Sequence, residues 1–116
     1  AEASVIGKAR ITNSVIGLRS FIGDDVELDE TVVMGNDYFR WHDPADRILM
    51  DGPDQPGIGD GTKIRRTIVD RNASIGKDCK ILNETGYDHF DGDGYFIRDG
   101  IVVIPKNGQI PDGTII

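Results

Sequence analysis

Aliphatic residues that recur every six positions are the feature that most limits how this 116-residue chain can fold. The spacing occurs in three runs: Ile16, Ile22, Leu28 and Met34; Ile58 and Ile64, followed by Val69, Ile75 and Ile81; and Ile104, Ile110 and Ile116. The residue two positions earlier is small or β-branched: Ser14, Ser20, Val26 and Val32; Thr62, Thr67, Ala73 and Cys79; Val102, Gly108 and Thr114. Side chains two apart on a strand share a face, so we expect both columns to point inward, with Ile64 and Ile75 deeply buried.

A unit of six residues matches a short strand plus a corner and does not match a helical period of 3.6. Glycine often follows the aliphatic residue, as at Gly17, Gly35 and Gly59, which suits a corner that needs positive φ. One unit cannot bury its own apolar face, so the units must coil and stack. Three units make a turn of about 18 residues and bring the chain back parallel to itself about 4.8 Å along the axis. The sequence therefore predicts an all-β parallel β-helix, with an antiparallel β-sandwich as the alternative.

Two acidic segments interrupt the repeat. We expect one domain over residues 1–116, with repeats at about 4–35, 56–83 and 97–116 and excursions at about 36–55 and 84–96. Loops of this length in a compact solenoid usually carry function or contacts. His42 and His89 lie in these excursions, and we interpret both as solvated loop histidines.

The composition of the chain argues against binding to nucleic acid and against membrane insertion. Twenty acidic against thirteen basic residues give a net charge of −7, which works against binding to nucleic acid. No apolar stretch approaches the roughly 18 residues of a membrane span, so we expect no membrane insertion. Cys79 is the only cysteine, which excludes an internal disulfide, and we expect a reducing, cytoplasmic location.

Two glycine-rich motifs resemble known ligand sites. The GIGDGT segment at 57–62 misses the glycine spacing of a nucleotide loop, and we interpret its glycines as corners. Asp91-Gly92-Asp93-Gly94 resembles the start of a calcium loop but lacks the later ligands, so a polar turn is expected there. We predict neither a metal site nor a catalytic residue in this chain.

The charge reverses locally between Asp60 and Lys80. Six bases, Lys63, Arg65, Arg66, Arg71, Lys77 and Lys80, face three acids, Asp60, Asp70 and Asp78. Guanidinium groups match phosphate oxygens, so this strip predicts a site for a phosphorylated metabolite. A solvated outer face of the coil is the alternative. Lys106 is the only base after Arg98 and lies beside a corner, where it suits a single anion contact.

With the repeat and excursions located, the chain resembles the C-terminal left-handed β-helix domain of glucose-1-phosphate adenylyltransferase, or ADP-glucose pyrophosphorylase. The stretches that carry the resemblance are SVIGLRSFIG at 14–23, VVMGNDYF at 32–39, GIGDGTKIRRTIVDRNASIG at 57–76 and GYFIRDGIVVIPKNGQIPDGTII at 94–116. The left hand of the coil comes from this resemblance, since ordinary parallel crossovers are right-handed.

The resemblance implies a subunit that converts ATP and glucose 1-phosphate to ADP-glucose and pyrophosphate, with Mg²⁺, in glycogen or starch synthesis. In this family the chemistry belongs to an N-terminal catalytic domain, which no part of this chain resembles, so we expect no catalysis from the chain alone and no cofactor in it. The β-helix contributes to assembly with other subunits, as a tetramer, and to binding of sugar-phosphate, phosphoglycerate or phosphate effectors. In a plant the location would be the plastid.

Individual residues carry over from the family pattern. Lys106 in IVVIPKNGQIP matches a lysine that takes part in activator binding, and Arg71 in IVDRNASIG stands where the plant-type pattern usually has lysine. Glu84 departs from the pattern, because an effector lysine often occupies that position. The residues expected to bind an effector or anion are Lys106, Arg71, Arg65, Arg66 and Lys63. A hexapeptide-repeat acyltransferase using His42 or His89 as general base, and a stacking module without ligand, are the alternatives.

Overall fold

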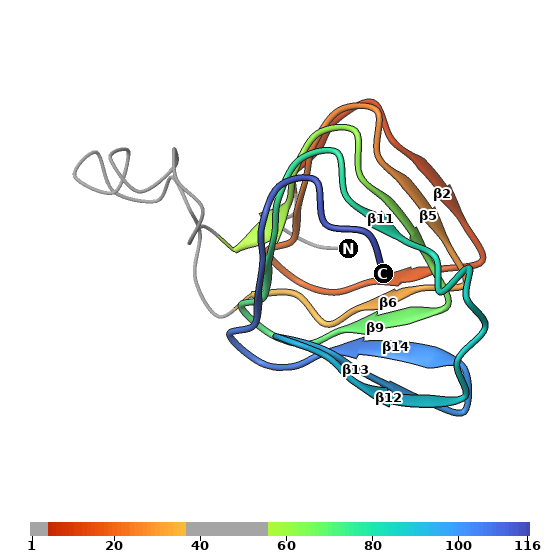
Figure 1. The fold of residues 1–116 in the computed structure, drawn as a ribbon. Helices are drawn as coiled ribbons and strands as arrows, with labels where there is room; N and C mark the ends of the chain where they lie inside the picture. Colours follow the sequence, from red (N-terminus) through yellow and green to blue (C-terminus); the bar gives the residue numbers. More distant parts are fainter. Residues whose placement is uncertain (1–4, 37–55) are drawn as a thin grey trace.

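The computed structural model describes residues 5–36 and 56–116, and in these residues the chain forms strands and turns without a helix. The strands make the three sides of a triangular coil (Figure 1). Sheet A contains β1 (Val5–Ile6), β4 (Phe21–Ile22), β7 (Gly57–Ile58), β10 (Ser74–Ile75) and β15 (Gln109–Ile110). Sheet B contains β2 (Arg10–Thr12), β5 (Glu27–Asp29), β8 (Lys63–Arg65) and β11 (Lys80–Ile81). Sheet C contains β3 (Val15–Ile16), β6 (Val32–Val33), β9 (Thr67–Val69), β14 (Ile101–Ile104), β13 (Phe96–Arg98) and β12 (His89–Asp91).

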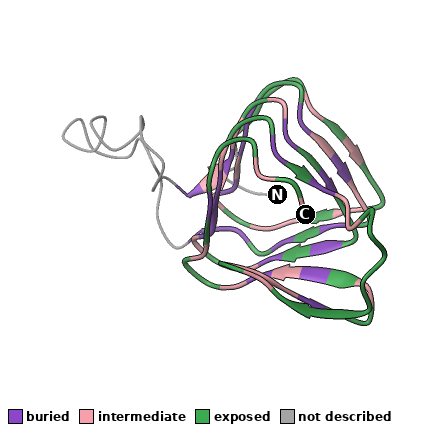
Figure 2. Cartoon of the chain, in the orientation of Figure 1, coloured by how far each residue is buried: buried purple, intermediate pink, exposed green. Residues whose placement is uncertain are grey.

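Successive turns of the coil stack in register as a parallel β-helix. Ile58 pairs with Ile75, and Ile64 pairs with Ile81, so one uninterrupted turn takes 17 residues, one fewer than the count from the repeat. The expected inward columns form the core: Ile64 is 2% exposed and Ile75 is 4% exposed. The predicted fold class and the burial of these two residues are confirmed. Figure 2 shows buried residues alternating with exposed ones along the strands.

The prediction that Met34 and Val32 point inward was wrong. Met34 is 44% exposed and Val32 is 36% exposed, whereas Thr31 and Val33 point into the core. The step from Leu28 on β5 to its counterpart Val33 on β6 is five residues, so counting by six arrives one residue late. A shift of one residue on a strand moves a side chain to the opposite face.

Hydroxyl groups in the small-residue column are satisfied by the backbone. Thr62 is fully buried, and its hydroxyl donates to the carbonyl oxygen of Gly76 at 2.7 Å and accepts the N–H of Cys79 at 3.2 Å. The hydroxyl of Thr67 donates to the carbonyl oxygen of Arg65 at 2.9 Å. Threonine is tolerated inside the coil because a buried polar group costs little once it is hydrogen-bonded.

The glycines that follow the aliphatic residues are required for a different reason from the one expected. Among Gly7, Gly17, Gly23, Gly35, Gly59 and Gly76, positive φ occurs at Gly35 alone, at 94°. The others lie against the backbone or an aspartate of the neighbouring turn: a Cβ on Gly59 would lie 2.7 Å from the carbonyl carbon and oxygen of Gly76. Positive φ falls instead on other corner residues, including Asn13, Arg19, Asp25, Arg66, Asn72, Asp78 and Asn107.

The second excursion folds into an antiparallel β-hairpin that extends sheet C. β12 pairs with β13, and β13 pairs with β14. Arg98 opposes Ile101 across a two-residue turn, Asp99-Gly100, in which both residues have positive φ, as a type I′ turn requires. The parallel coil resumes at β14, because Phe96–Arg98 still belongs to the hairpin. Of the first excursion, residues 37–55 lie outside the described residues, as does His42.

Candidate functional site

Two of the five expected effector residues lie together at the corner between sheets C and A. Arg71 follows β9, and Lys106 follows β14 in the next turn of the coil. Val69 pairs with Ile104, and the N–H of Asn107 donates to the carbonyl oxygen of Arg71 at 3.0 Å. Since stacked strands are about 4.8 Å apart, Arg71 and Lys106 occupy equivalent places on adjacent turns. We call this pair the C–A corner.

The turn that presents Lys106 is closed by its own backbone. The N–H of Gly108 donates to the carbonyl oxygen of Pro105 at 2.8 Å, and the N–H of Ser74 donates to the carbonyl oxygen of Gly108 at 2.8 Å. Asn107 adopts φ 61°, a conformation that asparagine accepts more readily than most residues. Lys106 therefore stands exposed on a turn whose backbone is fixed on both sides.

Among the described residues, the C–A corner carries two cations, Arg71 and Lys106, and one carboxylate, that of Asp70. The carboxylate of Asp70 accepts the backbone N–H of Arg71 at 2.6 Å, which engages the nearest acid in shaping the turn. In the part of the chain that the structure describes, no acidic side chain forms an ion pair with Lys106. A guanidinium group and an ammonium group that project from equivalent places on adjacent turns offer charges and donors of the kind that bind phosphate oxygens.

The other three expected residues lie elsewhere on the coil. Lys63 and Arg65 project from the outer face of β8 in sheet B, and Arg66 occupies the next corner. The ammonium group of Lys63 lies 3.5 Å from the carboxylate of Glu27, and the guanidinium of Arg66 lies 3.4 Å from that of Glu30. The basic strip of the sequence thus wraps around two sides of the coil, and acids of the preceding turn offset part of its charge.

Arg65 and Arg66 line a hollow of about 470 Å³ between the coil and the segment before the hairpin. Glu84, Asp88 and Asp99 line the same hollow. Three carboxylates against two guanidinium groups give this hollow no excess of positive charge. The departure from the family pattern at Glu84 therefore falls at a place where the structure disfavours an anion.

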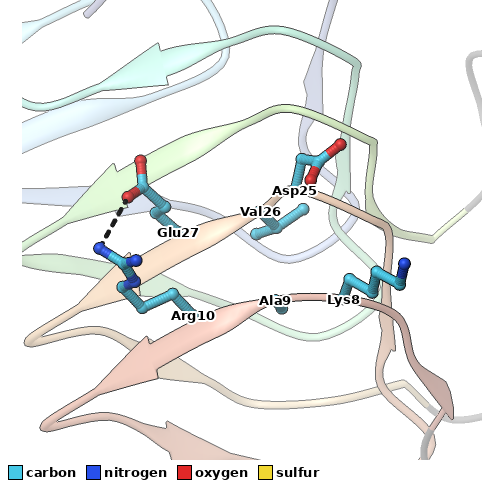
Figure 3. A pocket seen from close by; sticks show the side chains of 6 residues that line it. All are labelled: Lys8, Ala9, Arg10, Asp25, Val26 and Glu27. Atoms are coloured by element: carbon cyan, nitrogen blue, oxygen red, sulfur yellow. Dashed lines mark ion pairs between the residues drawn. The ribbon is translucent and has the colours of Figure 1, made fainter.

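A second hollow, of about 490 Å³, lies on the first two turns of the coil and was not anticipated from the sequence. Its charged lining consists of Lys8, Arg10, Asp25 and Glu27, two of each sign. The side chains of Arg10 and Glu27 pair at 3.8 Å (Figure 3). Balanced and partly paired charges make it a weaker candidate for an anion than the C–A corner.

The remaining motifs have structural roles in the described residues. Asp91-Gly92-Asp93-Gly94 leads into the turn between β12 and β13, where the N–H of Gly92 donates to the carbonyl oxygen of Tyr95 at 2.9 Å. In the GIGDGT segment, Gly57 lies in β7, and Gly61 lies in the corner that follows, where it adopts φ 76°. His89 lies on the outside of β12, and its Nε2 atom is 3.9 Å from the carboxylate of Asp99.

Across residues 5–36 and 56–116, no three His, Cys, Asp or Glu side chains gather in a way that could hold a metal ion. The same residues contain no helix of the length and apolarity needed to cross a membrane.

Comparison with known proteins relates the chain to one family of domains. A family model described as the GLGC left-handed parallel β-helix domain matches residues 1–115. The chain is 41% identical over 118 residues to glucose-1-phosphate adenylyltransferase large subunit 1, chloroplastic/amyloplastic, from Zea mays. That alignment covers 100% of this chain and 23% of the maize protein, so the chain spans less than a quarter of the relative's length.

Proposed function

The chain belongs to the family of GLGC left-handed parallel β-helix domains, and on that basis we propose that it is the regulatory and subunit-assembly domain of a glucose-1-phosphate adenylyltransferase. The whole subunit would convert ATP and glucose 1-phosphate to ADP-glucose and pyrophosphate in glycogen or starch synthesis. Catalytic residues and the Mg²⁺ that the reaction uses would belong to the part of the subunit outside this chain. The domain would act in the cytoplasm, or in the plastid of a plant.

The C–A corner is the observation that carries the regulatory role. It places Arg71 and Lys106, 35 positions apart in the sequence, on adjacent turns of the coil. A sugar phosphate, a phosphoglycerate or inorganic phosphate would place its anionic oxygens between the guanidinium and ammonium groups. The site lies in a rigid solenoid, so occupancy would affect the enzyme through contacts between this domain and the rest of the subunit.

The ends of the coil support the assembly role. Among the described strands, β1, β2 and β3 pair on one side only, and so does β15 at the other end of sheet A. Unpaired strand edges of a solenoid need cover from another domain or subunit. We propose that the catalytic domain and neighbouring subunits of a tetramer provide this cover.

An effector titration of the whole subunit tests the proposal. ADP-glucose formation is measured against 3-phosphoglycerate, fructose 6-phosphate and inorganic phosphate for the wild type, Lys106→Glu and the control Lys8→Glu, a lysine at a different corner. We expect Lys106→Glu to raise the half-saturating effector concentration at least about tenfold, equivalent to about 1.4 kcal/mol, with basal turnover unchanged. An unchanged response in Lys106→Glu would refute the assignment of the C–A corner.

A further inference from the structure

The hollow of about 470 Å³ beside the hairpin has an aromatic residue in its wall. Tyr87 lines this hollow and is 45% exposed. The hollow of about 490 Å³ on the first two turns is similar in volume, but no aromatic residue is among the described residues that line it. Covering an exposed ring with an apolar surface of a ligand is favourable. We call the cavity with the aromatic wall the hairpin hollow.

Tyr87 is held in place from two directions. Its backbone N–H donates to Oδ1 of Asn83 at 3.2 Å, and Nδ2 of Asn83 donates to its carbonyl oxygen at 2.9 Å. Its ring stacks on that of Phe90, with centroids 4.8 Å apart and an angle of 16° between the planes. Phe90 in turn lies 6.1 Å from the ring of Tyr95, which packs against the core. A ligand would therefore meet a ring that is already ordered, which lowers the entropy cost of binding.

Hydrogen-bonding groups of both kinds surround this ring. Three acidic residues and two arginines also line the hairpin hollow: Glu84, Asp88, Asp99, Arg65 and Arg66. An ionised carboxylate only accepts hydrogen bonds, and a guanidinium group only donates them. The guanidinium of Arg66 pairs with Glu30 at 3.4 Å, whereas Arg65 forms no ion pair with another residue that the structure describes. The hollow thus offers a ligand both acceptors and donors.

This mixture of groups selects one class of ligand. Three carboxylates disfavour an anion, two guanidinium groups disfavour an organic cation, and the described residues hold no group of side chains suited to a metal ion. An apolar ligand would bury charged groups without partners. A neutral sugar fits, because its hydroxyl groups both donate and accept while the C–H face of its ring covers Tyr87. The volume lies in the range of roughly 300–1,000 Å³ that is usual for small-molecule sites.

We propose that the hairpin hollow binds a neutral hexose unit of a carbohydrate. The sugar ring stacks on Tyr87, and its hydroxyl groups pair with the acidic residues and with Arg65. The site is separate from the C–A corner, since Arg66 occupies the corner between sheets B and C. A free sugar and a unit of a glucan chain share this chemistry. The proposal depends on the geometry of this chain alone and not on adenylyl transfer.

Saturation-transfer NMR on the full-length subunit tests this proposal. The probes are glucose, as a free sugar, and maltoheptaose, as a glucan chain, each titrated to give a dissociation constant. We expect transfer to the C–H protons of one face of the sugar ring. A lower dissociation constant for maltoheptaose would identify a glucan chain as the ligand, and equal constants would identify a single free hexose.

Variants assign the binding to the hairpin hollow. Tyr87→Ala should raise the dissociation constant at least about tenfold, whereas Tyr87→Phe, which keeps the ring, should stay within about twofold of the wild type. Arg65→Ala changes the coil and leaves the hairpin intact, and it should weaken binding several-fold. The matched control Lys8→Ala, in the hollow without an aromatic wall, should have no effect.

Absence of transfer to both sugars would overturn the proposal, as would equal dissociation constants in the wild type, Tyr87→Ala and Arg65→Ala. Tetramethylammonium chloride provides a further control. Binding of this cation in place of the sugars, with an affinity that falls as salt is added, would show that the hollow is a cation site and would also overturn the proposal. Sugar binding by a subunit that forms no ADP-glucose would refute the proposed function and leave the carbohydrate site standing.

Discussion

The backbone N–H of Asn107 lies 3.0 Å from the carbonyl oxygen of Arg71, and this hydrogen bond fixes two turns of the coil against each other at the C–A corner. The residue before Asn107 is Lys106, so the contact sets the positions from which the two cationic side chains project. The backbone of the corner therefore holds Arg71 and Lys106 at equivalent places on adjacent turns.

Substitutions at Arg71 should separate the contribution of charge from that of geometry. Arg71→Glu places a negative charge beside Lys106, and we expect at least a tenfold rise in the half-saturating concentration of a phosphorylated effector in the whole subunit. Arg71→Lys keeps the charge but loses the planar fork, so a rise of only a few-fold is expected. An effector titration of both variants checks this, and equal responses would contradict it.

The three cationic residues away from the C–A corner should not control the effector response. Lys63→Glu removes one of the two cationic partners of Glu27 and sets like charges on neighbouring strands, which should cost stability by up to about 1 kcal/mol. We expect the half-saturating effector concentration to stay within twofold of the wild type. A loss of response as large as that of Arg71→Glu would show that sheet B belongs to the site.

Truncation of the core should be costly because a stacked coil cannot collapse around a gap. Ile75→Ala and Ile64→Ala should each lower the free energy of unfolding by about 2–5 kcal/mol. Ile115→Ala, at a side chain that is 73% exposed, should change it by less than about 0.5 kcal/mol. Chemical denaturation of the three variants measures these differences, and similar values for Ile75 and Ile115 would be inconsistent with the fold.

Some corner positions require glycine because the next turn leaves no room for a Cβ atom, whereas others hold a larger residue at positive φ. Gly59→Ala would force a Cβ against the backbone of Gly76, which has no flexible end that can move aside, and should cost about 1–3 kcal/mol. Asp25→Gly, at φ 58°, relieves an unfavourable conformation and should change stability by less than about 0.5 kcal/mol. The same denaturation experiment checks the pair, and a larger loss for Asp25→Gly would reverse the explanation.

Much of the fold follows from the six-residue columns, because a buried side chain such as Ile64 must recur wherever a strand returns to the same side of the coil. Counting by six failed at Met34 because the step from an inward residue on sheet B to the next inward residue on sheet C is five residues. The hairpin was missed although Asp99-Gly100 between two apolar segments is a strong signal for a two-residue turn. Its antiparallel strands replaced an expected irregular loop.

The site was harder to predict than the fold. The four bases from position 63 to position 71 are close in sequence, but they lie on sheet B and on the two corners that follow it. Lys106 joins Arg71 only because one turn plus the hairpin separates them along the chain.

Adenylyl transfer by the native subunit that contains this domain is the most direct test of the account. The protein would be purified from its source cells with an antibody against the domain, and ADP-glucose formation from ATP and glucose 1-phosphate measured with and without phosphorylated effectors. We predict Mg²⁺-dependent formation of ADP-glucose whose rate changes with effector concentration. No transfer, or transfer that no phosphorylated effector alters, would contradict the assignment of this β-helix as the regulatory domain of such an enzyme.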